Sequence, residues 1–479
     1  MMEVLTPDIC VIGAGSGGLS VAAAAAAFGV PVVLIERDKM GGDCLNTGCV
    51  PSKALLAAGK RAETIRNAAL FGIKAQRLAV DFREVHAHVH GVIDAIAPND
   101  SKARFTGLGV RVIEGTARFK DDRTVVVDDD EFEIRARRFV IATGSTAALP
   151  PILGLAETPH LTNETVFDLR ILPKHLIVIG AGPIGLEMAQ AFRRLGSDVT
   201  VLEAAQPLAK DDPECAQIVL NQLEREGVVV RAGVRIASVA KMRTRLIVML
   251  AAADDDAHTE TIEGSHLLVA AGRRPVVEGL DLDKARVKVE RRGIVVDTGL
   301  RTTNKRVYAI GDVAGGLQFT HVANAHAGIV IRNALFRLPA KMRSDAIPWV
   351  TYTEPELAHV GLTEAEARQR HKQVRILRWP YHENDRAQAE RETHGHIKVV
   401  ATRRGRILGA TIVGAGAGEL ISIWTLAIGQ GLKIRAMTEF VMPYPTLAEI
   451  GKRAAISYYT PSLTSPFVRR IISFLRRFG

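Results

Sequence analysis

The sequence predicts a multidomain α/β protein in which a strand–turn–helix–strand unit occurs twice. A length of 479 residues is enough for about three domains. Hydrophobic residues make up 47% and charged residues 24% of the chain, which is typical of globular domains and excludes disordered, collagen-like and coiled-coil proteins. The 42 glycines exceed the average share, so we expect glycine where the backbone must approach another group closely.

The first unit begins with an apolar strand at residues 8–12. An alanine-rich helix runs to about Phe28, and a second strand at 32–35 ends in Glu36. The turn before the helix carries glycines in the spacing GxGxxG, namely Gly13, Gly15 and Gly18. Such glycines allow a tight turn whose helix amides face a pyrophosphate, and a carboxylate at the end of the second strand can accept hydrogen bonds from a ribose hydroxyl. This unit therefore predicts a Rossmann-like dinucleotide site.

The stretch from Ile9 to Ile35 carries no charge, so hydropathy alone would also fit a signal peptide or a membrane span. Acidic Glu3 and Asp8 precede it, where a signal peptide needs basic residues, and glycines and Pro31 interrupt it. No other apolar stretch approaches about 20 residues, so no transmembrane helix is predicted.

The second unit repeats the pattern, with a strand at 175–179, a helix ending at Leu195, and a strand at 199–202 that ends in Glu203. Its turn glycines are Gly180, Gly182 and Gly185. The first glycine and the final glutamate lie 23 residues apart in both units. One such motif is weak, whereas two in matching contexts indicate two dinucleotides. Because Glu203 would repel a 2′-phosphate, the second site is predicted to favour NADH over NADPH.

The segment GGDCLNTGCVPSK at residues 41–53 carries two of the four cysteines. In a regular helix Cys44 and Cys49 would lie about 7.5 Å apart along the axis, so the segment must be irregular if they pair. Pro51 suits the first turn of a following helix, which places Cys49 near a helix N-terminus, where the pKa of a thiol falls. Lys53, four residues on, would share its helix face. The alternative is two inert buried cysteines.

The remaining cysteines, Cys10 in the first strand and Cys215 on a probable helix, are interpreted as structural. Four cysteines are too few for a disulfide scaffold and lack the spacing of a paired zinc motif, which indicates a cytosolic enzyme. His321 and His326 are five residues apart on an expected helix and do not share a face, so no metal site is predicted. The net charge of +10 is dispersed, so no nucleic-acid partner is expected.

Three further motifs follow in order: Ala142-Thr143-Gly144-Ser145, Gly272-Arg273-Arg274-Pro275 and, after a strand at 307–310, Gly311-Asp312-Val313. With the two glycine motifs and the cysteine segment, the chain resembles over nearly its whole length the flavin-dependent pyridine nucleotide-disulfide oxidoreductases. That is the family of dihydrolipoamide dehydrogenase, glutathione reductase and mercuric reductase. The resemblance implies two Rossmann-like dinucleotide-binding domains plus a C-terminal α+β dimerisation domain, and therefore a homodimer.

The resemblance also implies the roles of the site residues. FAD would be held by Gly13, Gly15, Gly18, Glu36, Lys53, Thr143, Gly144, Gly311 and Asp312. The nicotinamide cofactor would be held by Gly180, Gly182, Gly185, Glu203, Gly272 and Arg273. Cys49 would be the thiol that faces the flavin, Cys44 the thiol that exchanges with substrate, and Glu187 the partner of Lys53. The expected activity is passage of electrons, in either direction, between NADH, FAD, a Cys44–Cys49 disulfide and a small disulfide or dithiol substrate.

The C-terminal region departs from part of that family. Members acting on small disulfides carry a His-Pro with an acidic residue five positions later, whereas this chain has Tyr444-Pro445 and keeps Glu449. A phenol titrates near 10 and is a poor proton acceptor at neutral pH. A tyrosine here is similar to mercuric reductase, so reduction of a thiol-bound metal ion is the alternative activity. Mercuric reductase carries a pair of adjacent cysteines at its extreme C-terminus to deliver mercury, whereas no cysteine follows Cys215 in this chain. We also expect no metal-binding module ahead of Met1. Both expectations count against mercury reduction.

The predicted domain order is an FAD-binding part at 1–150, a nicotinamide-binding domain at 151–275, a second FAD or central part at 276–343, an interface domain at 344–462, and a tail at 463–479.

The tail predicts a basic amphipathic helix. Its apolar residues recur at helical spacing: Phe467, Val468, Ile471, Ile472, Phe474, Leu475 and Phe478. Between them lie Arg469, Arg470, Arg476 and Arg477. Such a helix can dock on the protein's own dimer or lie on an anionic membrane surface. We expect a cytoplasmic enzyme with peripheral contact at the inner face of the membrane. A third hypothesis is a membrane-docked interaction module with vestigial turnover.

Overall fold

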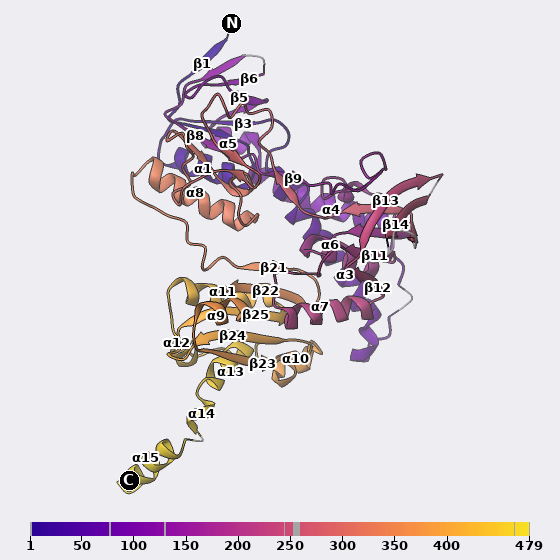
Figure 1. Ribbon diagram of the computed structural model, residues 1–479, viewed down its shortest axis with the longest axis vertical. Helices are drawn as coiled ribbons and strands as arrows, with labels where there is room; N and C mark the ends of the chain where they lie inside the picture. Colours follow the sequence, from indigo (N-terminus) through magenta and orange to yellow (C-terminus); the bar gives the residue numbers. More distant parts are fainter. Residues whose placement is uncertain are drawn as a thin grey trace. The chain divides into compact units, whose positions relative to one another are not determined.

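The computed structural model describes residues 2–75, 78–128, 131–243, 245–251, 259–463 and 465–478 (Figure 1). The chain divides into two compact units. The first comprises 1–180, 191–204 and 234–342, and the second comprises 181–190, 205–233 and 343–479. Both mix helices with sheets, so the predicted α/β class is confirmed.

The centre of the first unit is a five-stranded parallel sheet in the order β20-β8-β2-β3-β4. Its strands are β2 (Ile9–Ile12), β3 (Val32–Glu36), β4 (Arg111–Glu114), β8 (Arg138–Ile141) and β20 (Val307–Ala309). The central strand β2 is buried throughout, as expected for a continuous apolar run with neighbours on both sides. The first predicted strand begins one residue later than expected, and that of 307–310 ends one residue earlier.

Helices cover this sheet because their small and branched residues pack against it. Helix α1 (Ser16–Ala27) and helix α8 (Thr320–Ala334) contribute Val21, Ala25 and Val330 to one core cluster. On the other face, Cys10 of β2 lies in a separate cluster and is fully buried, in keeping with a structural role. The unit's other helices are α2 (Gly42–Asn46), α3 (Cys49–Arg66), α4 (Phe82–Ile96) and α5 (Lys102–Gly107).

The second glycine unit reproduces this arrangement. Strand β10 (His175–Ile179) pairs in parallel with β11 (Asp198–Glu203) and β16 (His266–Val269), and helix α6 (Pro183–Leu195) joins β10 to β11. The boundary between the two compact units falls within α6. An antiparallel sheet of β13 (Arg235–Met242), β14 (Arg245–Ala251) and β15 (Thr259–Gly264) shares a core with the β10 sheet.

Smaller elements complete the first unit. A four-stranded sheet contains β1 (Glu3–Leu5), β5 (Ala117–Phe119), β6 (Val125–Val127) and β7 (Phe132–Ile134). Two-stranded ribbons join β9 (Ser145–Ala147) to β17 (Arg273–Pro275) and β18 (Val289–Glu290) to β19 (Gly293–Ile294). Short 3-10 helices are η1 (Ala68–Phe71), η2 (Ala97–Asp100), η3 (Val166–Asp168) and η4 (Gly311–Ala314).

The second unit is built on a five-stranded antiparallel sheet in the order β21-β22-β25-β24-β23. The strands are β21 (Trp349–Thr351), β22 (Glu356–Gly361), β23 (Val374–Pro380), β24 (His396–Thr402) and β25 (Ile407–Gly414). Its further elements are α7 (Pro213–Arg225), β12 (Val228–Ala232), α9 (Glu364–Arg370), η5 (Tyr381–Glu383), α10 (Asp385–Glu390), α11 (Ala417–Gly429), α12 (Ile434–Glu439), α13 (Glu449–Ser457) and α14 (Thr460–Leu463). Buried Trp424 of α11 and Ala454 of α13 belong to its core.

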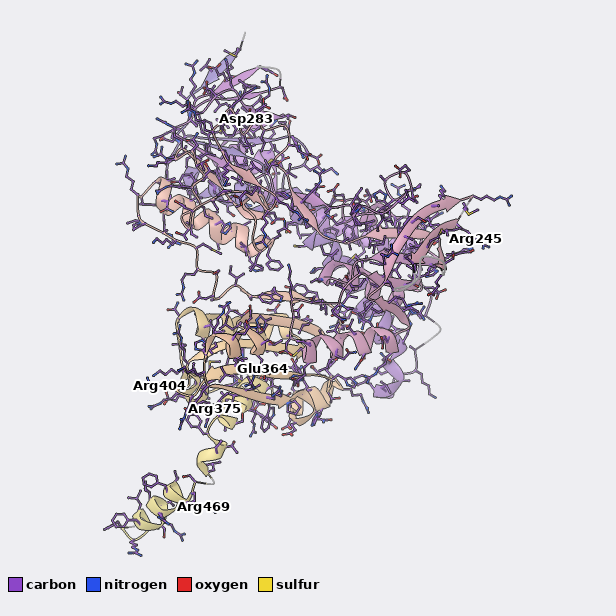
Figure 2. The ribbon with its side chains drawn as sticks, in the orientation of Figure 1. Arg245, Asp283, Glu364, Arg375, Arg404 and Arg469 are labelled. Atoms are coloured by element: carbon purple, nitrogen blue, oxygen red, sulfur yellow. The ribbon has the colours of Figure 1, made fainter. Side chains whose placement is uncertain are left out.

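A buried ion cluster links three elements of this unit. The ammonium of Lys398 on β24 lies 2.7 Å from Asp212, 3.2 Å from Glu214 and 2.8 Å from Glu364. Figure 2 labels Glu364 among the side chains of α9. Asp212 also caps the N-terminus of α7 by accepting a hydrogen bond from the amide of Glu214. Because Asp212 is almost fully buried, it depends on Lys398 for its opposite charge, whereas Lys398 is balanced by all three carboxylates.

The tail forms the predicted helix as α15 (Pro466–Leu475), and none of its residues is buried (Figure 2, Arg469). Among the described residues, no helix is both long enough and apolar enough to cross a membrane.

Candidate redox-active site

The turn after β2 has the geometry of a phosphate cradle. Gly13 adopts φ +103°, and a Cβ there would lie 2.5 Å from the carbonyl oxygen of Ala142. A Cβ on Gly18 would lie 1.9 Å from the carbonyl oxygen of Gly13. At Gly15 a Cβ would meet no atom of the described residues within 4 Å. The first and third glycines are therefore required by the protein's own packing, and the second faces open space where a pyrophosphate fits.

The turn after β10 repeats these features. Gly180 adopts φ +107°, and a Cβ there would lie 2.5 Å from the carbonyl oxygen of Ala270. Its amide donates to Leu202 over 2.8 Å, as the amide of Gly13 donates to Ile35 over 2.8 Å. A Cβ on Gly182 would meet nothing within 4 Å in the described part of the chain. The sequence repeat thus corresponds to a repeat in backbone geometry, and Gly185 lies in the first turn of α6.

Acidic residues end the second strand of each unit, as predicted. Glu36 ends β3, and its two carboxylate oxygens accept backbone hydrogen bonds from Ala14 at 2.6 Å and Asp38 at 2.9 Å. Each oxygen retains a lone pair for a ribose hydroxyl. Glu203 ends β11 at the equivalent place.

The cysteine segment is not one continuous helix, as we predicted from the five-residue spacing of Cys44 and Cys49. Cys44 lies on the short helix α2, the chain bends at Thr47 and Gly48, and Cys49 is the first residue of α3. Pro51 follows in the first turn of α3. The structure has no disulfide between the two cysteines, and their thiols are hydrogen-bonded to each other. The bend therefore brings two cysteines that are five residues apart into contact, which a continuous helix would not.

The two thiols differ in acidity. The hydrogen bond from Cys44 lowers the pKa of Cys49 to about 6, with Thr320 and Lys53 lowering it further against the effect of burial. The Sγ of Cys49 lies 3.5 Å from the hydroxyl of Thr320. The same hydrogen bond between the cysteines, together with burial, raises the pKa of Cys44. At neutral pH the pair therefore consists of a Cys49 thiolate and a Cys44 thiol.

A chain of polar contacts surrounds this segment. The guanidinium of Arg273 donates to the hydroxyl of Ser145 at 2.7 Å and to the carboxylate of Asp43 at 2.9 Å. Ser145 in turn donates to Asp312 at 2.5 Å. Burial raises the pKa of Asp312, against the opposing effects of Ser145 and Arg273. The structure thus places Arg273 beside the cysteine segment and beside Asp312.

Other predicted cofactor residues are held by backbone geometry. Thr143 donates its hydroxyl to the carbonyl of Val276 over 2.6 Å. Gly144, Gly272 and Gly311 have φ of +69°, +134° and +67° respectively, which disfavours any side chain there. The amide of Gly311 donates to Nδ1 of buried His326 at 3.1 Å.

The two histidines singled out in the sequence have different surroundings. Burial lowers the pKa of His326, whereas His321 is exposed and stacks on Phe319. No cluster of three or more metal-ligating residues occurs in the described part of the chain.

The remaining predicted catalytic residues lie in the second unit. Glu187 on α6 is buried, and its carboxylate accepts a hydrogen bond from the amide of Tyr352 at 2.9 Å. Tyr444 is 69% exposed, and its phenol donates to Asp385 at 2.7 Å, a hydrogen bond that raises the pKa of Tyr444. Glu449 is the first residue of α13. Pairing of Glu187 with Lys53 stays a prediction, as does a catalytic role for Tyr444 and Glu449.

Cys215 is buried and lies 3.6 Å from Nε2 of His396. Burial raises the pKa of Cys215, so this thiol stays protonated.

Sequence reasoning singled out neither Asp43 nor Thr320 as a functional residue. Asp43 lies inside the quoted cysteine motif, so an acidic residue adjacent to a reactive cysteine was an available signal. Thr320 is 271 residues from Cys49, and no local pattern marks it.

The residues present fit the two dinucleotides that the glycine motifs imply. Each turn leaves open space at its second glycine and a helix N-terminus directed at it, and each has a carboxylate at the end of the second strand.

Comparison with known proteins agrees with this geometry. Residues 7–327 match the model described as pyridine nucleotide-disulphide oxidoreductase, and residues 347–455 match the dimerisation domain of the same family. The chain is 36% identical over 457 residues to the mercuric reductase of Streptomyces lividans, covering 94% of this chain and 96% of the relative. It is 37% identical over 454 residues to the dihydrolipoyl dehydrogenase of Thermus scotoductus, covering 93% and 95%.

Solved structures give the same result. A structure titled LpdA from Mycobacterium tuberculosis superposes with a TM-score of 0.86 at 26% identity, covering 95% of this chain and 99% of that one. A Cu(II) complex of the HOCl-induced flavoprotein disulfide reductase RclA from Escherichia coli superposes with a TM-score of 0.82 at 28% identity, covering 93% and 98%.

These matches confirm the predicted enzyme class, its use of FAD with a pyridine nucleotide, and the presence of a dimerisation domain, which supports a homodimer. The chain therefore belongs to the pyridine nucleotide-disulphide oxidoreductases and is a flavin-dependent NAD(P)H oxidoreductase that acts on sulfur-containing groups.

Proposed function

We propose that this enzyme uses NADH and the Cys44–Cys49 pair to reduce a thiol-bound soft metal ion in preference to a small organic disulfide. The observation that carries the proposal is Tyr444, which stands where disulfide-reducing relatives have histidine and donates its phenolic proton to Asp385. FAD, when bound, supplies the two-electron connection between the nicotinamide and the cysteine pair.

The chemistry of the cysteine pair suits this reaction. Cys49 supplies a thiolate at neutral pH, stabilised by the Cys44 hydrogen bond, by Thr320 and by Lys53. Cys44 keeps its proton and is the thiol directed at substrate. A divalent ion held by two thiolates accepts two electrons and leaves as the metal. Its two thiolates leave as thiols, which take up the proton released by NADH and one proton from solvent.

The phenol limits the competing reaction. Reduction of a small disulfide produces a thiolate leaving group that must be protonated, and the reverse reaction needs a base to remove that proton. A tyrosine whose pKa is raised by Asp385 does not accept a proton at neutral pH. When a metal ion moves from a carrier thiolate to Cys44, the Cys44 thiol gives up its proton and the displaced carrier thiolate takes it up, so the exchange needs no separate base from the protein. Relatives of similar identity include dihydrolipoyl dehydrogenases, so the disulfide or dithiol reaction is the second candidate.

The test is NADH oxidation by the purified flavoprotein with Hg(II) in excess glutathione, compared with lipoamide. We expect metal-dependent oxidation that Cys44→Ser abolishes. Tyr444→His should raise lipoamide turnover, while Tyr444→Phe should not. Faster wild-type turnover of lipoamide than of Hg(II) would refute the proposal and favour the second candidate. No electron transfer to any acceptor would favour the interaction-module hypothesis.

We also propose NADH as the physiological reductant. Glu203 ends β11 where it can bind a free ribose hydroxyl and repel a 2′-phosphate. The ratio of kcat/KM for NADH over NADPH should exceed one and fall in Glu203→Ala. A wild-type preference for NADPH would contradict this assignment.

We further propose that the tail contacts an anionic membrane surface. Successive residues of a helix are rotated by about 100°, so the apolar side chains of α15 lie on one face of the helix. The arginines lie on the opposite face and border the apolar face on both sides. Phe467, Ile472 and Phe474 are 70%, 52% and 56% exposed. Residues 450–479 contain no Asp or Glu. An apolar face bordered by unopposed cations suits lipid headgroups better than the protein's own dimer.

Co-sedimentation tests this contact, using vesicles of phosphatidylcholine with and without phosphatidylglycerol. Binding should require the anionic lipid, weaken at high salt, and be lost both in Ile471→Asp and on deletion of residues 466–479. Binding unchanged by the deletion would refute the proposal. A dimer that dissociates on deletion without any vesicle binding would instead assign the helix to the dimer.

A further inference from the structure

A carboxylate lies directly beside the redox pair. Asp43 precedes Cys44 on α2, and one of its oxygens accepts hydrogen bonds from the hydroxyl of Thr47 at 2.7 Å and the amide of Asn163 at 3.0 Å. Its other oxygen accepts from Arg273 at 2.9 Å. One neighbouring donor, Thr47, and two donors from distant parts of the chain therefore fix this carboxylate in one orientation.

The negative charge of Asp43 opposes formation of a thiolate. It raises the pKa of both Cys44 and Cys49, against the effects that lower the pKa of Cys49. A carboxylate at this position would by itself make the reduced pair less stable, because the reduced pair carries the thiolate.

Arg273 is built to balance that charge. Its side chain is only 13% exposed, and it donates both to the hydroxyl of Ser145 at 2.7 Å and to the carbonyl of Ser145 at 2.9 Å. Arg273 lies on β17, which pairs with β9 so that Arg273 is opposite Ala147 and Pro275 opposite Ser145. The guanidinium is therefore positioned by a strand pair, and the terminal nitrogen that donates to the carbonyl of Ser145 also donates to Asp43.

The same arginine reaches the other end of the polar chain. Its Nε lies 3.9 Å from Asp312, which also accepts a hydrogen bond from Ser145. One cation thus serves two carboxylates, one beside the cysteines and one at the start of η4. Asp43 is 40% exposed, so solvent screens part of its charge, and its effect on the pKa values of the two thiols is smaller than that of the hydrogen bond between them.

We propose that Arg273 and Asp43 form a positioning pair that sets the reduction equilibrium of Cys44 and Cys49. This inference rests on the proposed role of the two cysteines as the redox centre. When Arg273 balances the charge of Asp43, the thiolate of the reduced cysteines is stable beside this carboxylate. When the cation is removed, the charge of Asp43 disfavours the reduced cysteines. Arg273 therefore acts on the redox centre in addition to any role in holding a nucleotide.

The test measures the disulfide fraction of the flavoprotein in glutathione buffers of defined ratio, by alkylation with a mass tag. Two glutathiones reduce the disulfide and leave as glutathione disulfide, so electrons balance. Arg273→Gln should shift the equilibrium roughly tenfold toward the disulfide, which corresponds to about 30 mV. Asp43→Asn should shift it in the opposite direction. The double variant should lie near the wild type, and Arg273→Lys should remain closest to it.

Opposite signs for the two single variants are the signature of charge balance. If both variants shift the equilibrium in the same direction, or if neither moves it by more than twofold, the inference is overturned. The flavin content and thermal melting of each variant identify any variant that fails to fold. If Arg273→Gln fails to fold, the inference is tested by the direction in which Asp43→Asn shifts the equilibrium. If NADH does not reduce the disulfide of the wild type, the proposed function fails separately, because the glutathione equilibrium does not require NADH.

Discussion

The acidity of Cys49 can be tested by removing the hydrogen bond that contributes most to it. Cys44→Ala eliminates the S–H donor, whereas Cys44→Ser keeps a donor of similar length in the same place. The wild-type pKa is about 6, so about half of Cys49 is thiolate at pH 6. A hydrogen bond to a charged group is worth about 1.5 to 3 kcal/mol, which corresponds to a rise of roughly 1 to 2 in the pKa of Cys49 when it is lost. The remaining effects of Thr320 and Lys53 keep it below that of an ordinary thiol.

The assay is the rate of alkylation by iodoacetamide as a function of pH, with the reduced protein and mass spectrometry to identify the cysteine. The wild-type rate should rise as pH increases through about 6 and reach a plateau near neutrality. In Cys44→Ala the midpoint should move upward, and at pH 6 the thiolate fraction should fall by roughly five- to fiftyfold. The midpoint is the quantity to compare, because the nucleophilicity of a thiolate rises with its pKa and alters the plateau. Cys44→Ser should lie between the two.

An unchanged midpoint in Cys44→Ala would refute the reasoning, because it would assign the acidity of Cys49 to Thr320 and Lys53 without any contribution from Cys44. A Thr320→Val variant is the matched control, since it removes the weaker 3.5 Å contact and should move the midpoint less.

Two further predictions concern folding and cofactor binding. Lys398→Met should lower the free energy of unfolding in urea by about 3 to 5 kcal/mol, because it leaves the buried carboxylate of Asp212 without its cation. Adding Asp212→Asn should recover part of this loss. A loss below about 1 kcal/mol would show that Asp212 does not need a buried cation. Gly18→Ala should yield protein without bound flavin, as read from its visible spectrum, because the new Cβ would lie 1.9 Å from the carbonyl of Gly13, whereas Gly91→Ala on α4 should keep its flavin. A fully flavinated Gly18→Ala protein would show that the turn relaxes to accommodate the methyl group.

Local chemistry is what the sequence by itself determined. The two glycine turns, the helix that begins at Cys49 and the tail helix depend on residues that are neighbours in the chain. Glycine at positive φ, proline in a first turn and apolar periodicity each restrict the backbone where they stand. Their positions agreed with prediction to within about one residue at most element ends.

The tertiary structure alone decided which distant groups meet. Asp43 and Arg273 are 230 residues apart, and the contact exists because β17 pairs with β9 and presents the guanidinium to the cysteine segment. Thr320 reaches Cys49 from the first residue of α8, and Asp385 holds the phenol of Tyr444. Such contacts depend on how strands and helices pack, and packing depends on the whole chain, so no local pattern encodes them. The acidity of the reactive thiol is therefore set both by Cys44 and Lys53, which the cysteine motif contains, and by Thr320, which only the tertiary structure brings to it.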